Sequence, residues 1–62
     1  MESRTVIKLV EAVGWYEVGH EGSHKPFQHP TRRGKVTVPH PKKDIPIGTV
    51  RSIMRQAGWE HL

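Results

Sequence analysis

Apolar residues near the two ends of the chain recur with the period of an α-helix. Close to the start, one apolar stripe follows the spacing i, i+3, i+4 and i+7 and consists of Val6, Leu9, Val10 and Val13, with Ile7 beside it. Such a stripe is typical of a helix that buries one side against a core. Ser3 is a suitable residue to cap the start of this helix. Gly14 can end it in the left-handed conformation, with Trp15 as the hydrophobic residue of a Schellman-type stop.

A second helix near the end of the chain follows the same rules. Its apolar stripe consists of Ile47, Val50, Met54 and Ala57, flanked by Ile53. Pro46 fits the first turn, where the missing N–H of proline costs nothing. Gly58 and Trp59 then close this helix in the way that a glycine and a tryptophan close the first one.

Between the helices the apolar residues alternate with polar ones, as they do in half-buried strands. We expect three short strands, over residues 15–20, 25–29 and 35–38, with turns at Gly22-Ser23 and at residues 31–34. Parallel crossovers need longer links than these. The order α-β-β-β-α therefore predicts an α+β fold, in which a three-stranded antiparallel sheet carries both helices on one face.

Alternation along the strands also predicts which side chains face water. If Phe27 points into the core, His24 and Gln28 lie on the open face of the sheet. Lys35 and Thr37 join them if the valines on either side of Thr37 point inward. The open face would then carry polar and cationic side chains.

Positive charge is concentrated in residues 24–43. This stretch holds six of the ten lysine and arginine residues and no acidic residue, and the whole chain has a net charge of +4. The six are Lys25, Arg32, Arg33, Lys35, Lys42 and Lys43. Such a run predicts a surface for a polyanion such as RNA; a solvated face without a partner is the alternative.

The composition excludes several classes of protein. With 62 residues the chain forms one domain at most, over residues 1–62, and without cysteine it has neither a disulfide framework nor a thiolate zinc site. No apolar run approaches the roughly 20 residues of a membrane span, and no secretion signal is recognisable. We therefore expect a cytoplasmic protein that has no membrane partner.

His24 is the candidate catalytic residue. Histidine transfers protons near neutral pH because its unperturbed pKa is about 6.5. RNA carries its own nucleophile, the ribose 2′-hydroxyl, so a protein that moves one proton beside stabilising cations could cleave it. The alternative is that His24 is a polar turn residue. His40 is either a loop residue or a second member of the active site, held by a stiff connection with prolines at positions 39, 41 and 46.

The remaining histidines raise the question of a metal site. His20, His24, His29 and His40 could in principle surround zinc. The spacing argues against it, because His20 and His24 lie across a turn and His29 is expected on the opposite strand face from His24. We expect no metal, and we interpret His20, His29 and His61 as solvated surface residues.

Three segments together resemble the HicA (YcfA-like) family of mRNA interferase toxins. They begin at Gly22, Gly34 and Ile45 and read GSHKPF, GKVTVPHP and IPIGTVRSIMRQAG. The resemblance extends over almost the whole chain. It implies a double-stranded-RNA-binding-domain-like fold, cleavage of mRNA without metal or other cofactor, and neutralisation by a HicB-type antitoxin.

The resemblance also implies roles for individual residues. The catalytic histidine of the family corresponds to His24, and the glycine and serine of its motif correspond to Gly22 and Ser23. Many members have a second histidine where this chain has Lys25, so the second proton carrier here would be Lys25, His40 or solvent. Two other functions remain open: a non-catalytic RNA-binding module that acts by occupancy, and one half of a protein complex whose acidic partner covers the basic face.

Overall fold

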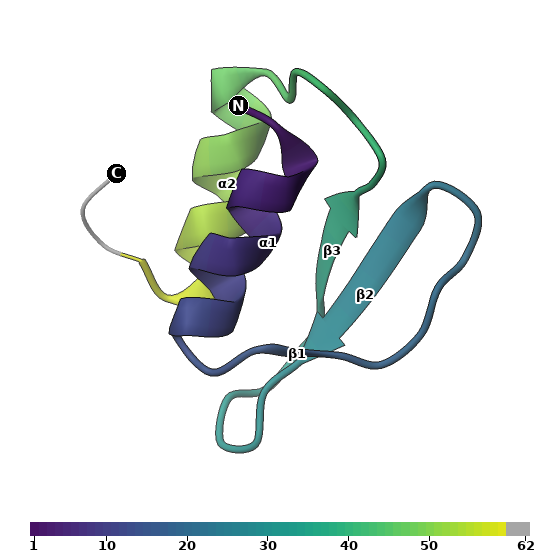
Figure 1. The fold of residues 1–62 in the computed structure, drawn as a ribbon. Helices are drawn as coiled ribbons and strands as arrows, with labels where there is room; N and C mark the ends of the chain where they lie inside the picture. The colour runs from purple at the N-terminus through teal and green to yellow at the C-terminus, as the bar shows by residue number, and fades with distance from the viewer. Residues whose placement is uncertain (60–62) are drawn as a thin grey trace.

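Two helices and a three-stranded sheet follow one another in the order α-β-β-β-α in the computed structural model, which describes residues 1–59. The elements are α1 (Ser3–Ala12), β1 (Tyr16–Glu17), β2 (His24–Gln28), β3 (Val36–Pro39) and α2 (Ile47–Ala57). Both helices lie on the same side of the sheet (Figure 1). The predicted fold class is therefore confirmed. Within residues 1–59 no helix is long and apolar enough to cross a membrane.

The sheet is antiparallel, with β2 between β1 and β3. In β2, Phe27 lies opposite Glu17 of β1 and Val36 of β3. The first strand is much shorter than the predicted residues 15–20, and Pro26 explains why. The N–H of Val18 still donates to the Pro26 carbonyl at 3.0 Å, but proline has no N–H to return, so the ladder ends there.

The start of α1 differs from the prediction. Ser3 is the first helical residue instead of the cap, and Glu2, which precedes it, makes no capping bond with its side chain. The N–H of Ser3 donates instead to the carbonyl of Lys42 at 2.9 Å. The connection between β3 and α2 thus provides an acceptor for one of the first helix N–H groups, which have no partner within the helix.

Both helices end in the predicted Schellman geometry. Gly14 has a φ of +97°, and the N–H of Trp15 donates to the carbonyl of Val10 at 3.2 Å. Gly58 has a φ of +93°, and the N–H of Trp59 donates to the carbonyl of Met54 at 2.8 Å. The positive φ is the reason that glycine stands at these positions.

The start of α2 is less buried than predicted. Pro46 precedes the helix instead of forming part of its first turn, and Ile47 is 60% exposed instead of belonging to the apolar stripe. Ile45, in the connection before α2, is buried and fills the core at this end. Ile53, expected at the flank of the stripe, is also buried.

The core lies between the helices and the sheet. Its buried side chains are Val6, Val10, Trp15, Phe27, Val36, Val38, Ile45, Val50, Ile53, Met54 and Ala57. The two tryptophans join the helices, because the Trp15 indole N–H donates to the carbonyl of Ala57 at 2.9 Å and the Trp59 indole N–H donates to that of Leu9 at 2.9 Å. Each helix end is thereby tied to the other helix.

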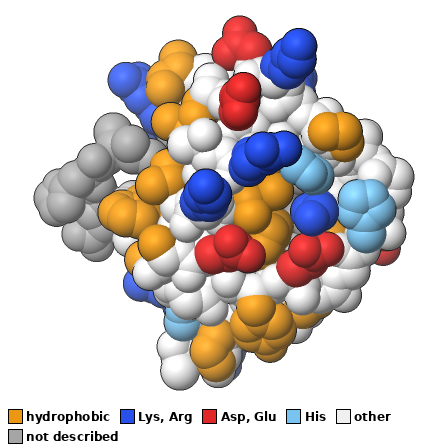
Figure 2. Space-filling model, in the orientation of Figure 1, with side chains coloured by type: hydrophobic (Ala, Val, Ile, Leu, Met, Phe, Trp, Pro, Cys, Tyr) orange, Lys and Arg blue, Asp and Glu red, His pale blue; other side chains and the backbone are white. Residues whose placement is uncertain are grey.

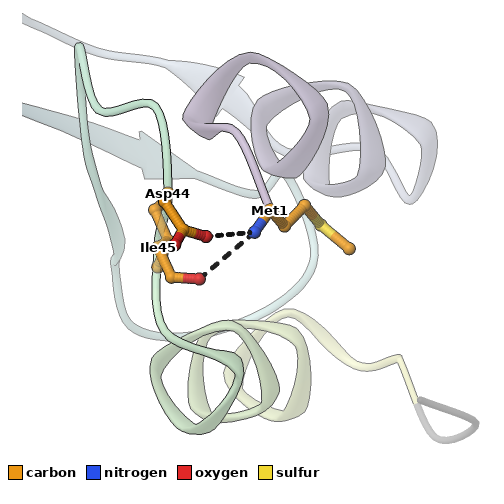
Figure 3. A network of polar contacts seen from close by, with 3 residues as sticks. All are labelled: Met1, Asp44 and Ile45. Carbon is orange, nitrogen blue, oxygen red and sulfur yellow. Dashed lines mark hydrogen bonds and ion pairs between the residues drawn. The ribbon is translucent and has the colours of Figure 1, made fainter.

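The first residue holds the connection between β3 and α2 in place. The α-amino group of Met1 lies 3.1 Å from a carboxylate oxygen of Asp44 and donates to the carbonyl of Ile45 at 3.3 Å (Figure 3). The carbonyl of Met1 in turn accepts the N–H of Ile45 at 2.8 Å. This connection is therefore tied to the start of α1 at both Lys42 and Ile45.

Candidate active site and nucleic-acid interface

His24 is the first residue of β2 and follows a tight turn. The turn is Gly22-Ser23, closed by two hydrogen bonds of 3.0 Å between the backbones of Glu21 and His24. Gly22 has a φ of +58°, which matches the first position of a type II′ hairpin turn and favours glycine there. His24 is exposed while Phe27 is buried. The predicted placement of His24 on the open face is confirmed.

Two residues lie directly opposite His24. Pro39 faces it across the β2–β3 pairing, and Glu21 faces it across the turn. Directly opposed residues of an antiparallel pair project to the same face, with Cβ atoms about 4.5–5.5 Å apart. No hydrogen bond within residues 1–59 uses the imidazole of His24, so neither ring nitrogen is occupied by a protein group there.

The cationic run at residues 24–43 does not form one patch around His24. Arg32, Arg33 and Lys35 belong to the connection between β2 and β3, at the far end of β2 from His24. At about 3.3 Å per residue, the two ends of β2 are about 13 Å apart. On the face drawn in Figure 2, basic side chains are separated by acidic and neutral ones. The expectation of a single surface over residues 24–43 is wrong, because a hairpin sends the two halves of the run to opposite ends of the sheet.

Lys25 lies on the other face of the sheet from His24. It pairs with Val38, whose side chain is buried under the helices. Its ammonium nitrogen is 3.3 Å from a carboxylate oxygen of Glu17, and its side chain is only 22% exposed. Lys25 is thus engaged in an ion pair on the side of the sheet away from His24.

Lys42 and Lys43 lie at the same end of the sheet as His24. The N–H of His40 donates to the carbonyl of Ser23 at 2.7 Å, which extends the β2–β3 pairing beyond Pro39. The lysines follow immediately along the chain. The structure therefore brings His40 and two of the six predicted cations to the turn that carries the candidate catalytic residue.

A pocket of about 330 Å³ opens between the start of α1 and the segment after β3. Its lining includes Glu2, Ser3, Arg4, His40, Lys42 and Lys43. Arg4 was missed by the sequence reasoning, since it lies twenty positions before the cationic run, and only the packing of α1 brings it beside Lys42. A basic residue next to a serine in the first turn of a helix does not by itself indicate a functional site.

His29 is a structural residue instead of a solvated one. Its Nε2–H donates to the carbonyl of Val13 at 2.8 Å, and its Nδ1 accepts the N–H groups of Thr31 and Arg32 at 3.1 and 3.2 Å. The ring also packs edge-on against Trp15, at 5.2 Å between centroids. Both ring nitrogens are therefore occupied by backbone groups, which removes His29 from any set of metal ligands.

The other histidines can also be placed. His20 is exposed, as predicted, and His61 lies outside the described residues. Within residues 1–59, no three histidine, aspartate or glutamate side chains gather as metal ligands would.

Comparisons with known proteins agree with this architecture. The family model described as HicA toxin of bacterial toxin-antitoxin matches residues 3–59. A solved structure titled "HicA3 and HicB3 toxin-antitoxin complex" is 37% identical in sequence, with a TM-score of 0.82 over 94% of this chain and 94% of that chain. No curated protein matches the chain. Because the family model covers nearly the whole chain and the solved relative agrees in both sequence and fold, the chain belongs to the HicA toxin family of bacterial toxin–antitoxin systems.

Proposed function

We propose that this toxin is an endoribonuclease that cleaves mRNA with His24 as a proton-transfer residue. The observation that carries the proposal is the position of His24: an exposed imidazole directly after a two-residue turn, within the Gly-Ser-His motif of a HicA chain. An exposed histidine held at the end of a hairpin can reach a polymer that passes over the open face. A histidine that served only the fold would have partners of its own, as His29 has.

The reaction needs no group beyond the RNA and the protein. The ribose 2′-hydroxyl attacks the neighbouring phosphorus and loses its proton, while the bond to the 5′-oxygen breaks and that oxygen gains a proton. The products are a 2′,3′-cyclic phosphate and a free 5′-hydroxyl. His24 performs one of the two proton transfers, and such a positioned acid or base contributes about 10²- to 10⁴-fold in rate.

We propose a HicB-type antitoxin as the protein partner. The solved relative is a toxin-antitoxin complex of HicA3 and HicB3. In this chain, Tyr16 and Val18 expose 49% and 42% of their surface at the edge of the sheet formed by β1. Exposed aromatic and aliphatic side chains at a sheet edge suit a protein partner, and a partner that extended from there over the open face would cover His24.

A cleavage assay tests the catalytic assignment. Purified wild-type protein should cut labelled RNA in the presence of a chelator, and His24→Ala should lose at least about 100-fold of that rate. His20→Ala is the matched control, because it removes another exposed histidine close by and should cleave normally. Cleavage by His24→Ala at the wild-type rate would contradict the role of His24. A mobility shift without any cleavage by the wild type would instead select the non-catalytic RNA-binding function.

A further inference from the structure

We propose that the pocket beside the start of α1 binds a phosphate group of the substrate RNA, close along the strand to the phosphate at which the RNA is cleaved. The proposal rests on the nuclease function above and adds a second contact site to it. The site consists of the side chains of Arg4, His40, Lys42 and Lys43. Three of these are permanent cations, and the fourth presents an N–H group.

The charge of the pocket favours an anion. Arg4, Lys42 and Lys43 face one carboxylate, that of Glu2, so the lining has a net charge of +2 before His40 is counted. All three cationic side chains are exposed, and within residues 1–59 none of them is ion-paired with a carboxylate. Lys25 differs from these three residues, because its ammonium group is ion-paired with Glu17. The cations of the pocket are free to contact a ligand.

The hydrogen bonds of Ser3 determine how His40 faces the pocket. The Ser3 hydroxyl is buried, accepts the N–H of Lys42 at 3.0 Å and lies 2.8 Å from Nδ1 of His40. If Nδ1 carried the hydrogen, the Ser3 hydroxyl hydrogen would have no acceptor within residues 1–59, and such an unmet group is costly when buried. The hydroxyl therefore donates to Nδ1, and the neutral ring carries its hydrogen on Nε2.

His40 consequently carries an N–H group at Nε2, the ring nitrogen that is not bonded to Ser3. A nitrogen that carries a hydrogen suits hydrogen bonding to an anion and does not suit a general base. Its bond to Ser3 and its place in the pocket favour a role for His40 in holding the substrate, with His24 as the proposed proton-transfer residue.

The backbone makes the pocket rigid. The N–H of Ser3 donates to the carbonyl of Lys42, and the N–H of Lys42 donates back to the Ser3 hydroxyl. The segment that carries the lysines is therefore fixed to α1 before any ligand arrives. A site formed in advance loses little entropy on binding, which strengthens the contact.

The pocket is joined to the catalytic turn. The carbonyl of Ser23, the residue before His24, accepts the backbone N–H of His40. The His24 side chain projects from the open face, whereas the His40 ring turns toward α1. An RNA strand that passes around this end of the sheet would place one phosphate at His24 and another at the pocket.

The donors suit a phosphate better than a carboxylate. A phosphodiester carries its charge on two oxygens that accept several hydrogen bonds, and an arginine fork with two ammonium groups and an imidazole N–H offers that many. The pocket volume of about 330 Å³ is also at the lower end of the range for small-molecule sites. It can receive a phosphate together with part of its sugar.

The test compares two double variants that each remove two positive charges. Lys42→Gln/Lys43→Gln alters the pocket, and Arg51→Gln/Arg55→Gln alters exposed positions of α2 outside it. The probe is a fluorescent single-stranded oligoribonucleotide with 2′-O-methyl groups throughout, which the protein can bind but not cleave. Affinity is measured by anisotropy over a series of salt concentrations.

The pocket variant should bind at least about tenfold more weakly, and its log–log salt slope should fall by about 0.7 for each phosphate that the protein no longer neutralises. The α2 variant should change less than about threefold. Equal reductions in affinity for the two variants would overturn the proposal, as would a pocket variant that binds RNA normally but binds an acidic antitoxin more weakly.

Because the probe cannot be cleaved, this result is independent of the nuclease assignment. If RNA binding depended on the pocket but the wild type did not cleave RNA, the proposed nuclease function would be wrong and the phosphate site would be supported. If cleavage depended on His24 and RNA binding did not depend on the pocket, the nuclease function would be supported and the phosphate site would be wrong. As a second readout, inorganic phosphate should shift the ring resonances of His40 in NMR spectra of the wild type but not shift those of His20.

Discussion

The carbonyl of Ser23 and the backbone N–H of His40 are joined by a hydrogen bond of 2.7 Å. This bond connects the turn that carries His24 to the segment that carries the pocket. Because it involves only backbone atoms, replacing the His40 side chain leaves it in place. The two histidines can therefore be tested separately.

His40→Ala should weaken substrate binding more than turnover. Loss of one hydrogen bond to a charged group corresponds to roughly a tenfold increase in KM, with kcat changed only a few-fold. His24→Ala should show the opposite pattern, because it removes the proposed proton-transfer residue. Steady-state kinetics on a short RNA measure both parameters. A loss confined to kcat in His40→Ala would mean that His40 takes part in proton transfer.

Ser3→Ala should destabilise the fold although it removes only one oxygen atom. The change leaves the N–H of Lys42 without its acceptor and Nδ1 of His40 without its donor in a partly buried place. We expect a loss of about 1 to 3 kcal/mol in the free energy of unfolding, measured by urea titration. Thr5→Ala is the control, because Thr5 is exposed on the same helix and should change stability by less than about 0.5 kcal/mol.

The overall fold could be predicted from periodicity and from helix stop signals. The apolar stripes of the two helices and the glycine–tryptophan pairs that end them are local patterns, and the structure reproduces them at Gly14 and Gly58. Ile47 departs from its stripe because Ile45, outside the helix, fills the core there. The boundary of β1 required knowledge of its partner, since the missing N–H that ends the ladder belongs to Pro26 on the neighbouring strand.

The candidate site could be predicted only in part. Alternation from Phe27 placed His24 on the open face correctly. The same alternation places Lys25 on the opposite face, but a count of charges along the chain hides that difference. Ser3 joins the pocket through hydrogen bonds that span 37 residues or more, such as the one with His40, and Arg4 lines it from the same helix turn. Such contacts depend on how a helix packs against the rest of the chain, and no local sequence pattern specifies that packing.

Trp15→Phe should show the value of the indole hydrogen bond. Phenylalanine preserves most of the apolar surface but leaves the buried carbonyl of Ala57 without its donor. We expect a loss of about 1 to 3 kcal/mol in the free energy of unfolding. Trp59→Phe removes a similar bond, to Leu9, in a partly buried place, and should cost less because water can replace the donor. Equal costs would show that apolar contact, and not the hydrogen bond, dominates.

Two glycines should respond to alanine in opposite directions. Gly14 has a φ of +97°, and a Cβ there would lie 2.8 Å from Nε2 of His29. Gly14→Ala should therefore lower stability by more than about 1 kcal/mol, through backbone strain and through displacement of the His29 ring. Gly48 lies in α2 with open space around it, so Gly48→Ala should raise stability by about 0.5 to 1 kcal/mol. Thermal or urea unfolding measures both, and a neutral Gly14→Ala would contradict the assigned role of His29.

Lys25 and Lys42 should differ in their contribution to RNA binding, although both belong to the same cationic run. Lys25 is held by Glu17 on the helix side of the sheet, so Lys25→Gln should change RNA affinity less than about twofold and leave the salt slope unchanged. Its ion pair is near the surface and should contribute no more than about 1 kcal/mol to stability. Lys42→Gln should lower the affinity clearly and reduce the slope by about 0.7. If the affinity fell equally in the two variants, the RNA would have to contact both faces of the sheet. That result would contradict a complex in which the RNA contacts only the open face and the neighbouring pocket.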